Sequence, residues 1–354
     1  MLTPLFIIVA IVALGFLIVV HEGGHYFVAR WCRMRIERFS IGFGPGLLKR
    51  TSKKTGTTFQ LAPIPFGGFV EIRGMNIAED VDPDDKYAYP NRPVWQRFLT
   101  IFAGPATNYL SAIVLAFALY AIHGIDARHW VGVGEVMKDY DAYGKLEPGD
   151  RITKVNGAPL FYDSHPSLTE QINQAGGAPL ALTVERGGQS LDIVVKPRQG
   201  KDAAGKPSWM IGVKLAYPEV VVEVSPLKAA REALIYPVKQ TRLIGHVLYG
   251  VVFGEEKADP GGPIRIVKEF YQAFSTSIVD GIGLVMTLSV YLGLFNLLPI
   301  PALDGGRLVF LLYEMVTRRR ANPKIETMVH MAGIMALGVV MLVVLYIDLR
   351  HLVS

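Results

Sequence analysis

The sequence is poor in cysteine and in charge. Its one cysteine among 354 residues excludes an intrachain disulfide and a cysteine-rich metal cluster. Charged residues make up 19% of the chain and apolar residues 51%, which disfavours a disordered chain and a nucleic-acid-binding protein. The mean hydropathy of +0.31 favours a membrane protein that also carries a sizeable water-soluble part. The 36 glycines and 22 prolines predict many turns or interrupted helices.

Four long apolar segments predict the membrane-spanning part. The length of each segment is close to the roughly 20 residues that a helix needs to cross a bilayer core. The first is interpreted as a retained helix and not a cleaved signal peptide, because no Lys or Arg precedes it and no small-residue cleavage site follows it. We expect transmembrane helices near residues 3–25, 98–122, 279–301 and 328–348.

The basic residues predict the orientation in the membrane. Twelve Lys and Arg residues lie from Arg30 to Arg97, and five more follow the third apolar segment. Helix parity places these two loops on the same side, and the positive-inside rule makes that side cytoplasmic. Both termini and residues 123–277 are then expected outside the cytoplasm.

Residues 129–217 have the pattern of a small β-rich domain. The run from Leu146 to Gly157 predicts a turn, a strand and an Asn-Gly turn. It has the form L-x-x-G-D-x-I-x-x-V-N-G, which resembles a bacterial, permuted PDZ domain. Such a domain binds an extended peptide at an open sheet edge, and a generic β-rich domain is the alternative. One helix is expected to start after Ser164 or Ser167 and to end at Ala175. Strands are expected near residues 131–136, 151–155, 180–185, 191–195 and 211–215.

Residues 225–253 have a helical pattern that is too charged to span a membrane. They predict an amphipathic helix that lies on the outer membrane surface or packs on the helix bundle. A buried helix of the soluble part is the alternative.

The candidate chemistry begins with His21-Glu22-Gly23-Gly24-His25, an H-E-x-x-H motif. Residues i and i+4 share a face of a helix, so both imidazoles can reach one metal ion, with Glu22 beside them to accept a proton from water. Ionisable residues at the end of an apolar span are costly and indicate function. Interfacial polar residues without a metal are the alternative.

A catalytic zinc ion needs a third protein ligand, and the candidate is Asp304. It follows the third apolar segment, and helix parity brings that point to the same leaflet as His21 and His25. Pro299 and Pro301 interrupt the helix there, and the two glycines after Asp304 are expected to let the backbone turn inward. A turn-capping aspartate before Gly-Gly is the alternative.

Several pieces, in this order along the chain, resemble the bacterial regulator-of-sigma-E type of intramembrane site-2 protease. Each piece alone is modestly specific, but together they cover nearly the whole sequence. The pieces are HEGGH at 21–25, FGGFVEIRGM at 66–75, FAGPATNYL at 102–110, the PDZ-like domain, GGPIRI at 261–266 and NLLPIPALDGG at 296–306.

The resemblance implies a zinc metalloendopeptidase that hydrolyses a peptide bond inside the membrane. It implies Zn²⁺ held by His21, His25 and Asp304, with Glu22 as the catalytic base. The implied partner is a single-pass membrane protein, such as an anti-sigma factor, that is cut after a first cleavage in regulated intramembrane proteolysis. A peptide or substrate segment would bind the PDZ domain, which either captures peptide or excludes bulky substrates.

A transmembrane substrate must unwind before hydrolysis, and each freed backbone group costs several kcal/mol in lipid unless it is paired. The resemblance implies that the substrate pairs with an edge strand in a β element that dips into the membrane. Asn296 and Asn108 would hydrogen-bond the unwound substrate, although helix–helix contact is an alternative role for Asn296. The residues implied to bind substrate are Gly67, Gly68, Phe69, Val70, Asn108 and Asn296.

The predicted fold is a membrane α-helical bundle of four transmembrane helices with an inserted extracytoplasmic β-rich PDZ domain. We expect a multi-pass protein of the bacterial cytoplasmic (inner) membrane, in contact with lipid, with its active site near the cytoplasmic leaflet and no nucleic-acid partner. The expected divisions are two membrane halves at 1–122 and 278–354, the PDZ domain at 123–217, and amphipathic linker helices on the outer membrane surface at 218–277.

Two features depart from the family's pattern. Gly23 and Gly24 replace bulkier residues within the motif, which lowers helix propensity by about 1 kcal/mol per glycine. One PDZ domain is evident where many close relatives carry two, so the substrate is an anti-sigma factor or another membrane protein.

Two other functional classes compete with the protease. A membrane-anchored PDZ scaffold with an inactive zinc site is disfavoured by the intact Glu22, because a binding protein has no use for a base beside two ligands. A metal transporter would need polar residues along several spans, whereas the second and fourth are nearly devoid of them.

Overall fold

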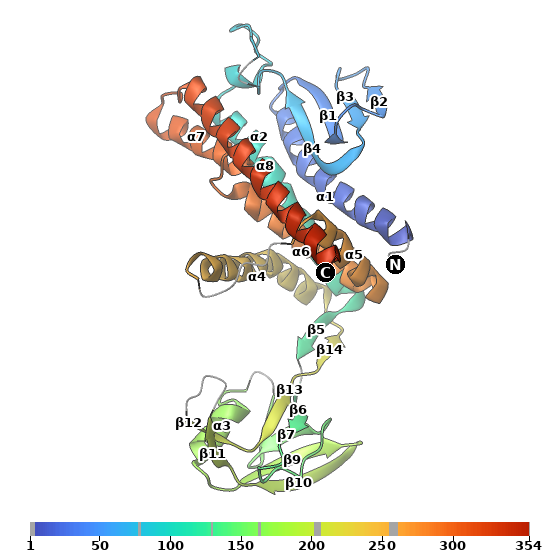
Figure 1. Ribbon diagram of the computed structural model, residues 1–354, viewed down its shortest axis with the longest axis vertical. Coiled ribbons are helices and arrows are strands. Elements are labelled where there is room, and N and C mark those ends of the chain that lie inside the picture. Colours follow the sequence, from blue (N-terminus) through green and yellow to red (C-terminus); the bar gives the residue numbers. More distant parts are fainter. Residues whose placement is uncertain are drawn as a thin grey trace. The chain divides into compact units, whose positions relative to one another are not determined.

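The computed structural model describes residues 4–76, 79–128, 130–161, 164–201, 207–254 and 261–353. The chain divides into two compact units (Figure 1). The helical unit comprises Met1–Ile122 and Ser225–Ser354, and the β-rich unit comprises His123–Val224. A helical membrane part with an inserted β-rich domain is therefore confirmed as the fold class.

Four helices are long and apolar enough to cross a membrane, as predicted. They are α1 (Pro4–Trp31), α2 (Val94–His123), α6 (Ile278–Leu297) and α8 (Pro323–Val353). Helix α1 continues six residues past its predicted end at His25, so the H-E-x-x-H motif lies inside the helix. Tertiary packing stabilises the helix through both glycines of the motif, as it does for most helices in proteins.

Three further helices complete the helical unit: α4 (Pro226–Val252), α5 (Pro263–Thr276) and α7 (Asp304–Thr317). Helix α7 occupies most of what the sequence predicted to be a short basic loop after the third span. Its Leu308 and Leu311 are buried against Ile101 of α2. Burial of this apolar face explains why the segment is helical.

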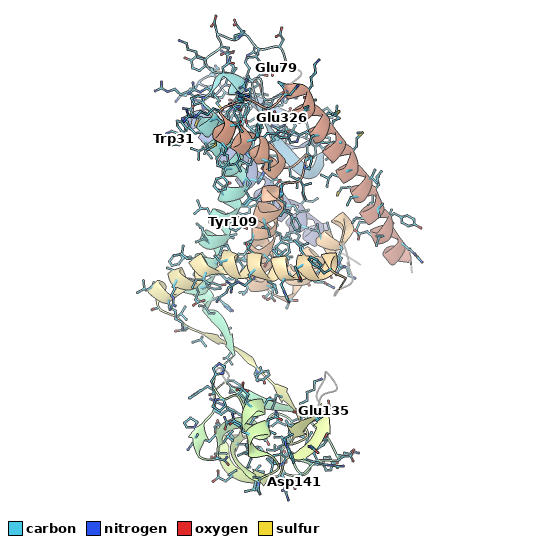
Figure 2. The ribbon with its side chains drawn as sticks, turned by 90° about the vertical axis from the view of Figure 1, so that its left-hand side faces the viewer. Trp31, Glu79, Tyr109, Glu135, Asp141 and Glu326 are labelled. Carbon is cyan, nitrogen blue, oxygen red and sulfur yellow. The ribbon has the colours of Figure 1, made fainter. Side chains whose placement is uncertain are left out.

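Helices α4 and α5 both pack on the membrane-spanning helices. Phe270 of α5 is fully buried against Leu17 of α1 and Val285 of α6, so this helix belongs to the bundle core, although we expected linker helices on the membrane surface. On α4, Thr241 Oγ1 lies 2.9 Å from the hydroxyl of Tyr109 on α2 (Figure 2). Packing on the bundle was one of the two positions predicted for α4.

Helix α8 is exposed along most of its length and is anchored near its end by Asp348. This buried carboxylate accepts backbone hydrogen bonds from Gly262 at 3.1 Å, Ile264 at 3.0 Å and Arg265 at 3.3 Å. These N–H groups open α5, so Asp348 satisfies donors that have no partner within that helix.

A four-stranded sheet follows α1 in the helical unit. It consists of β1 (Ile36–Phe43), β2 (Leu48–Thr51), β3 (Thr58–Leu61) and β4 (Ile64–Ile72) in the order β2-β3-β1-β4. Strands β1 and β3 are parallel, and the other neighbours are antiparallel. Its inner face packs on the end of α1, where Ile36 and Val70 join Met34 in one buried cluster. Strand β4 lies at an edge of this sheet, and the 3₁₀ turn Tyr89–Asn91 leads into α2.

The β-rich unit contains a six-stranded antiparallel sheet and one helix. The predicted strands and the predicted helix are all present, and α3 (Leu168–Ala175) is capped by Ser167, whose hydroxyl accepts from the N–H of Glu170. The sheet order is β10-β9-β7-β6-β13, with β8 paired to β7. The strands are β6 (Val131–Val136), β7 (Arg151–Val155), β8 (Ala158–Pro159), β9 (Leu180–Arg186), β10 (Gln189–Val195) and β13 (Val213–Ala216).

Two small ladders accompany this sheet. Strand β11 (Arg198–Lys201) pairs with β12 (Pro207–Met210), and β5 (Ile125–Arg128) pairs with β14 (Glu219–Val222). None of these four short strands was predicted, because each has only a few residues and lacks a long alternating pattern.

The run from Leu146 to Gly157 forms the turn and hairpin that its sequence predicted. Asn156 and Gly157 both adopt positive φ, at 49° and 80°, as a two-residue hairpin turn between β7 and β8 requires. Asp150 is buried and accepts two hydrogen bonds of 2.7 Å from the guanidinium of Arg186. Burial raises the pKa of Asp150, but these bonds outweigh it and hold the pKa below its ordinary value.

We expect Asp150→Asn to destabilise the β-rich unit by about 2 kcal/mol, because Arg186 would lose its charge-assisted partner. A lowered pKa contributes stability that is complete above the unfolded pKa of about 3.9 and is lost as the pH falls through the folded value. Hydrogen exchange of the β7 and β9 amides in the full chain, corrected for intrinsic rates, measures both effects.

The matched control is Glu185→Gln, which breaks the exposed pair of Glu185 with Arg151 at 3.5 Å. An exposed pair of this kind contributes less than about 1 kcal/mol. If the β7 and β9 amides lose equal protection from hydrogen exchange in the two variants, Asp150 does not stabilise the β-rich unit as proposed.

Candidate metal centre

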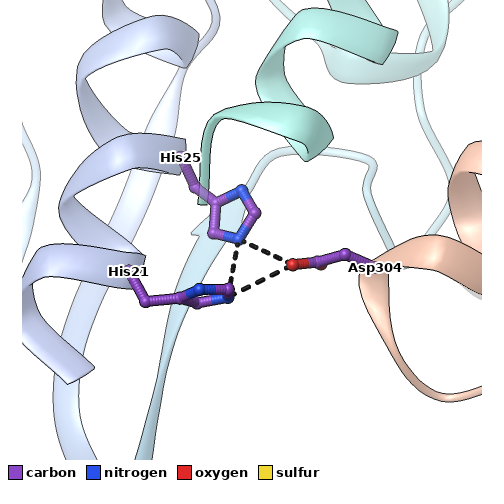
Figure 3. A group of neighbouring side chains, drawn as sticks. All are labelled: His21, His25 and Asp304. Carbon is purple, nitrogen blue, oxygen red and sulfur yellow. Dashed lines mark hydrogen bonds and ion pairs between the residues drawn. The ribbon is translucent and has the colours of Figure 1, made fainter. Parts of the chain in front are cut away.

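Three side chains from distant parts of the chain meet in the helical unit (Figure 3). Nε2 of His21 and Nε2 of His25 lie 3.3 Å apart, and Oδ2 of Asp304 lies 3.2 Å and 3.3 Å from them. Two ligands bound to zinc at about 2.05 Å with a tetrahedral angle lie about 3.3 Å apart. The triangle of ligand atoms therefore has the dimensions of one face of a tetrahedral zinc site.

The hydrogen bonds around the cluster indicate how its ligand atoms face one another. Asp304 Oδ2 is buried and accepts no hydrogen bond from the described residues, although both imidazoles are within reach. Nδ1 of His25 lies 2.8 Å from the Thr100 carbonyl and donates to it, which leaves Nε2 with a free electron pair. A metal cation stabilises a buried carboxylate oxygen that lies beside two imidazole nitrogens, so the residues fit zinc.

Helices α1 and α2 approach closely behind the histidines. A Cβ atom on Gly24 would overlap the Ala103 carbonyl, and one on Gly104 would overlap the His25 imidazole. Small residues allow helix backbones to approach in this way. Gly24 therefore sets the separation of the two helices, and Gly104 leaves room for His25 to reach the cluster.

Asn108 lies behind His21, away from the cavity. It is fully buried, and its Nδ2 lies 3.0 Å from Nδ1 of His21. If Nε2 of His21 binds a metal ion, Nδ1 carries the proton, and a 180° turn of the amide brings the unpartnered Oδ1 of Asn108 to accept it. This position is that of a residue that orients His21, and it differs from the substrate contact that the sequence led us to expect.

Asp304 begins α7, directly after the interrupted segment that follows α6. The helix break at Pro299 and Pro301 is present as predicted. Gly305 and Gly306, however, are helical, and a Cβ on them would overlap the Leu298 and Ile300 carbonyls. The two glycines serve close packing of α7 on the preceding loop, and not the inward turn that we expected.

Glu22 and strand β4 share one cavity with the three ligands. The cavity has a volume of about 1410 Å³ and is lined by His21, Glu22, His25, Asp304, Asn296 and residues 67–72 of β4, among others. A Cβ on Gly68 would lie 2.7 Å from Ile18 Cγ2 and 3.2 Å from Glu22 Cγ. Strand β4 therefore packs directly on the face of α1 that carries the catalytic candidates.

The predicted substrate-contacting residues divide into two groups. Gly67, Gly68, Phe69, Val70 and Asn296 line the cavity, whereas Asn108 does not. The side-chain amide of Asn296 donates to the Leu292 carbonyl of its own helix at 2.9 Å, and it forms no helix–helix hydrogen bond among the described residues.

One end of the cavity is polar, which no sequence pattern had indicated. The guanidinium of Arg97 donates to both carboxylate oxygens of Glu314, at 3.1 Å and 2.5 Å. Figure 2 shows Glu326 and Glu79, which also line the cavity, at the same end of the helical unit. Nearby, burial raises the pKa of Tyr89 to about 12, so this phenol stays neutral. The Arg97–Glu314 pair spans 217 positions, which is why no local pattern predicted it.

Thr100 also helps to orient a ligand of the metal centre, and the sequence analysis did not predict this role. It acts through its backbone carbonyl on His25, and a carbonyl group leaves no side-chain signal. Gly104 stands within a motif that the sequence singled out, but its contact with His25 depends on how α1 and α2 pack.

Comparison with known proteins gives a consistent result. The model of "Peptidase family M50" matches residues 9–341. Proteins of Rickettsia conorii and Agrobacterium fabrum, each named "Putative zinc metalloprotease", are 30% and 31% identical to this chain. The alignments cover 97% and 99% of this chain and 98% and 97% of those proteins.

A similarly named protein of Brucella suis is 33% identical over 84% of this chain and 82% of its own length. Among solved structures, the PDZ domain of an SdrC-like protein from Listeria innocua is 25% identical. That match covers 24% of this chain and 92% of the PDZ structure, with a TM-score of 0.21.

The two motif glycines give a matched pair of variants. We expect Gly24→Ala to force α1 and α2 apart, because the Ala103 carbonyl cannot move away, and to lower zinc affinity at least tenfold. A Cβ atom on Gly23 would meet only Phe27 Cε2, at 3.8 Å, so Gly23→Ala should retain zinc and stabilise the helix by up to about 1 kcal/mol. Zinc content after dialysis and thermal unfolding in detergent are measured for both variants. Equal zinc content and equal stability of the two variants would contradict the packing argument.

Proposed function

The chain belongs to peptidase family M50, and from this premise we propose that this zinc metalloprotease cleaves a peptide bond within or near the transmembrane segment of a membrane protein. The observation that carries the proposal is the convergence of His21, His25 and Asp304 beside Glu22 and an edge strand in one cavity. The metal-site geometry supports peptide hydrolysis, and the position between apolar helices supports a substrate taken from the membrane.

The three converging side chains are the proposed zinc ligands, and three is the number of ligands that a catalytic zinc site takes from the protein. Zinc, when bound there, would lower the pKa of a water molecule toward about 7 and polarise a carbonyl. Thr100 and Asn108 orient the two imidazoles from behind, so that both Nε2 atoms point to the same place.

Glu22 is the proposed general base and acid. It lies one residue from His21 on α1, lines the same cavity, and has the backbone N–H of Val70 within hydrogen-bonding reach. Its carboxylate takes a proton from the attacking water and returns it to the leaving amine.

Strand β4 is the proposed site for the unwound substrate. It lies at an edge of its sheet and pairs with β1 only, among the described strands. An extended substrate can therefore add to its free edge and satisfy backbone groups that would be costly in lipid. Gly67, Gly68, Phe69 and Val70 supply this edge next to Glu22, and Asn296 faces the same cavity to hydrogen-bond the substrate backbone.

The protein is proposed to act in the bacterial inner membrane as a regulator-of-sigma-E type protease. The basic loops support a metal centre near the cytoplasmic leaflet and a β-rich unit outside the cytoplasm. In this proposal residues 123–217 form a PDZ domain that meets the substrate first, either by capturing peptide or by excluding bulky extracytoplasmic segments. The substrate class is a single-pass membrane protein, such as an anti-sigma factor, after a first cleavage.

Glu22→Gln tests the catalytic role. We expect cleavage of a membrane-embedded test substrate to fall at least 10²-fold, because proton transfer is lost, while zinc content stays unchanged because no ligand is removed. Asp304→Ala is the matched comparison and should lose both zinc and activity. Undiminished cleavage by Glu22→Gln, or full zinc content in Asp304→Ala, would contradict the proposed mechanism.

Cysteine labelling tests the orientation. With the buried Cys32 replaced by serine, Ser190→Cys in the β-rich unit should react with a membrane-impermeant maleimide added outside the cell. Lys53→Cys, in an exposed turn after α1, should react only after the membrane is permeabilised. The reverse pattern would overturn the assigned topology.

A further inference from the structure

Helix α8 contacts the loop that precedes Asp304 through the imidazole of His330. The backbone N–H of Ala302 donates to Nδ1 of His330 at 3.2 Å. Ala302 is two residues before Asp304, in the segment between α6 and α7. Within the described part of the chain, no other side chain hydrogen-bonds the backbone of residues 298–303.

The backbone of this loop is strained where His330 contacts it. Ala302 has a φ of +79°, a left-handed conformation that is unfavourable for a residue with a Cβ atom. The loop's own hydrogen bonds are short-range, from Ile300 to the Leu298 carbonyl and from Leu303 to the Ile300 carbonyl. The bond to His330 is therefore the tertiary hydrogen bond available to hold Ala302 in this conformation.

A second contact between α8 and the same loop lies one turn further along the helix. A Cβ atom on Gly333 would overlap Pro301, so the helix backbone and the loop are in close contact there. Most other residues of the apolar part of α8 are exposed. His330 and Gly333 thus bring this part of the helix against the segment that carries Asp304.

The hydrogen bond also defines the tautomer of His330. Since Nδ1 accepts a hydrogen bond from the backbone N–H of Ala302, the neutral imidazole carries its own proton on Nε2. Nε2 is buried and has no partner among the described residues. An unpaired buried donor is unfavourable, so the contribution of His330 rests on Nδ1 and not on Nε2.

We propose that His330 is a positioning residue for the metal centre. By accepting the Ala302 N–H, it holds the strained loop so that Oδ2 of Asp304 meets the two imidazole nitrogens of α1. The inference rests on the proposed function, in which Asp304 is a zinc ligand. Loss of a partner that orients a ligand typically weakens metal binding 10–100-fold.

Side chains that replace one imidazole nitrogen at a time test this role. In His330→Asn, the amide oxygen occupies the place of Nδ1 and still accepts from Ala302. In His330→Gln, a polar atom reaches the place of Nε2 and leaves Ala302 without its partner, and His330→Phe removes both nitrogens.

The measurement is Zn²⁺ affinity of the purified full-length chain in detergent, by competition with a chelator. We expect His330→Gln and His330→Phe to bind zinc 10–100-fold more weakly and His330→Asn to stay within about threefold of the native affinity. Zinc-saturated variants should recover most of the native kcat. Met335→Ala, at an exposed position on the same helix, is the control and should not change affinity.

Relief of the backbone strain at Ala302 provides an independent test. Ala302→Gly adopts positive φ without penalty, so the loop should need His330 less. We expect His330→Phe to lose less zinc affinity in the Ala302→Gly background than in the native chain, in a double-mutant cycle.

Equal zinc affinity of native and His330→Phe proteins overturns the inference, as does equal weakening by His330→Asn and His330→Phe. Asp304→Ala in the same assay separates this failure from that of the proposed function. If Asp304→Ala loses zinc and His330→Phe does not, only the positioning role of His330 is wrong. If Asp304→Ala binds zinc normally, the proposed ligand set itself is wrong.

Discussion

The structure of the helical unit depends on bringing two imidazoles and one carboxylate together among apolar helices. Each of these groups is costly in such surroundings unless it is paired. Their ligand atoms lie within 3.3 Å of one another, so one metal cation can satisfy all three. This requirement fixes where α1 and the start of α7 must lie, because a shift of about 1 Å in either would open the triangle. Helix α2 supports the histidines through Thr100 and Asn108.

Glycine makes these positions possible. Gly24 and Gly104 let α1 approach α2, Gly68 lets β4 approach α1, and Gly305 lets α7 pack on the end of α6. Each of these glycines faces a backbone carbonyl or a functional side chain that a Cβ atom would overlap. Close backbone packing therefore brings α1, α2, β4 and α7 together around the cavity of about 1410 Å³.

Much of the fold and of the candidate site could be predicted from the sequence. The four spans, the strands of the β-rich unit, the Asn156-Gly157 hairpin and the Ser167 cap follow from local periodicity and turn chemistry, which act over a few residues. The pairing of His21 with His25 follows from the i to i+4 geometry of a helix. Asp304 could be added because helix parity places it near the same membrane face.

Other features depend on contacts between distant segments and leave no local pattern. The H-E-x-x-H motif predicts a metal site but not that Thr100 and Asn108 orient its imidazoles, since one acts through a carbonyl and the other looks like any polar residue in a span. The glycines after Asp304 suggest a turn, whereas packing against Leu298 makes them helical.

The sequence by itself determined which residues can carry the chemistry, because ligand identity and helical spacing are local properties. Only the tertiary structure decided how these residues are supported: Asn108 behind His21, β4 beside Glu22, and His330 on the loop of Asp304. Such support arises from side-chain packing between helices that are far apart in the chain, and that packing exists only once the helices have assembled.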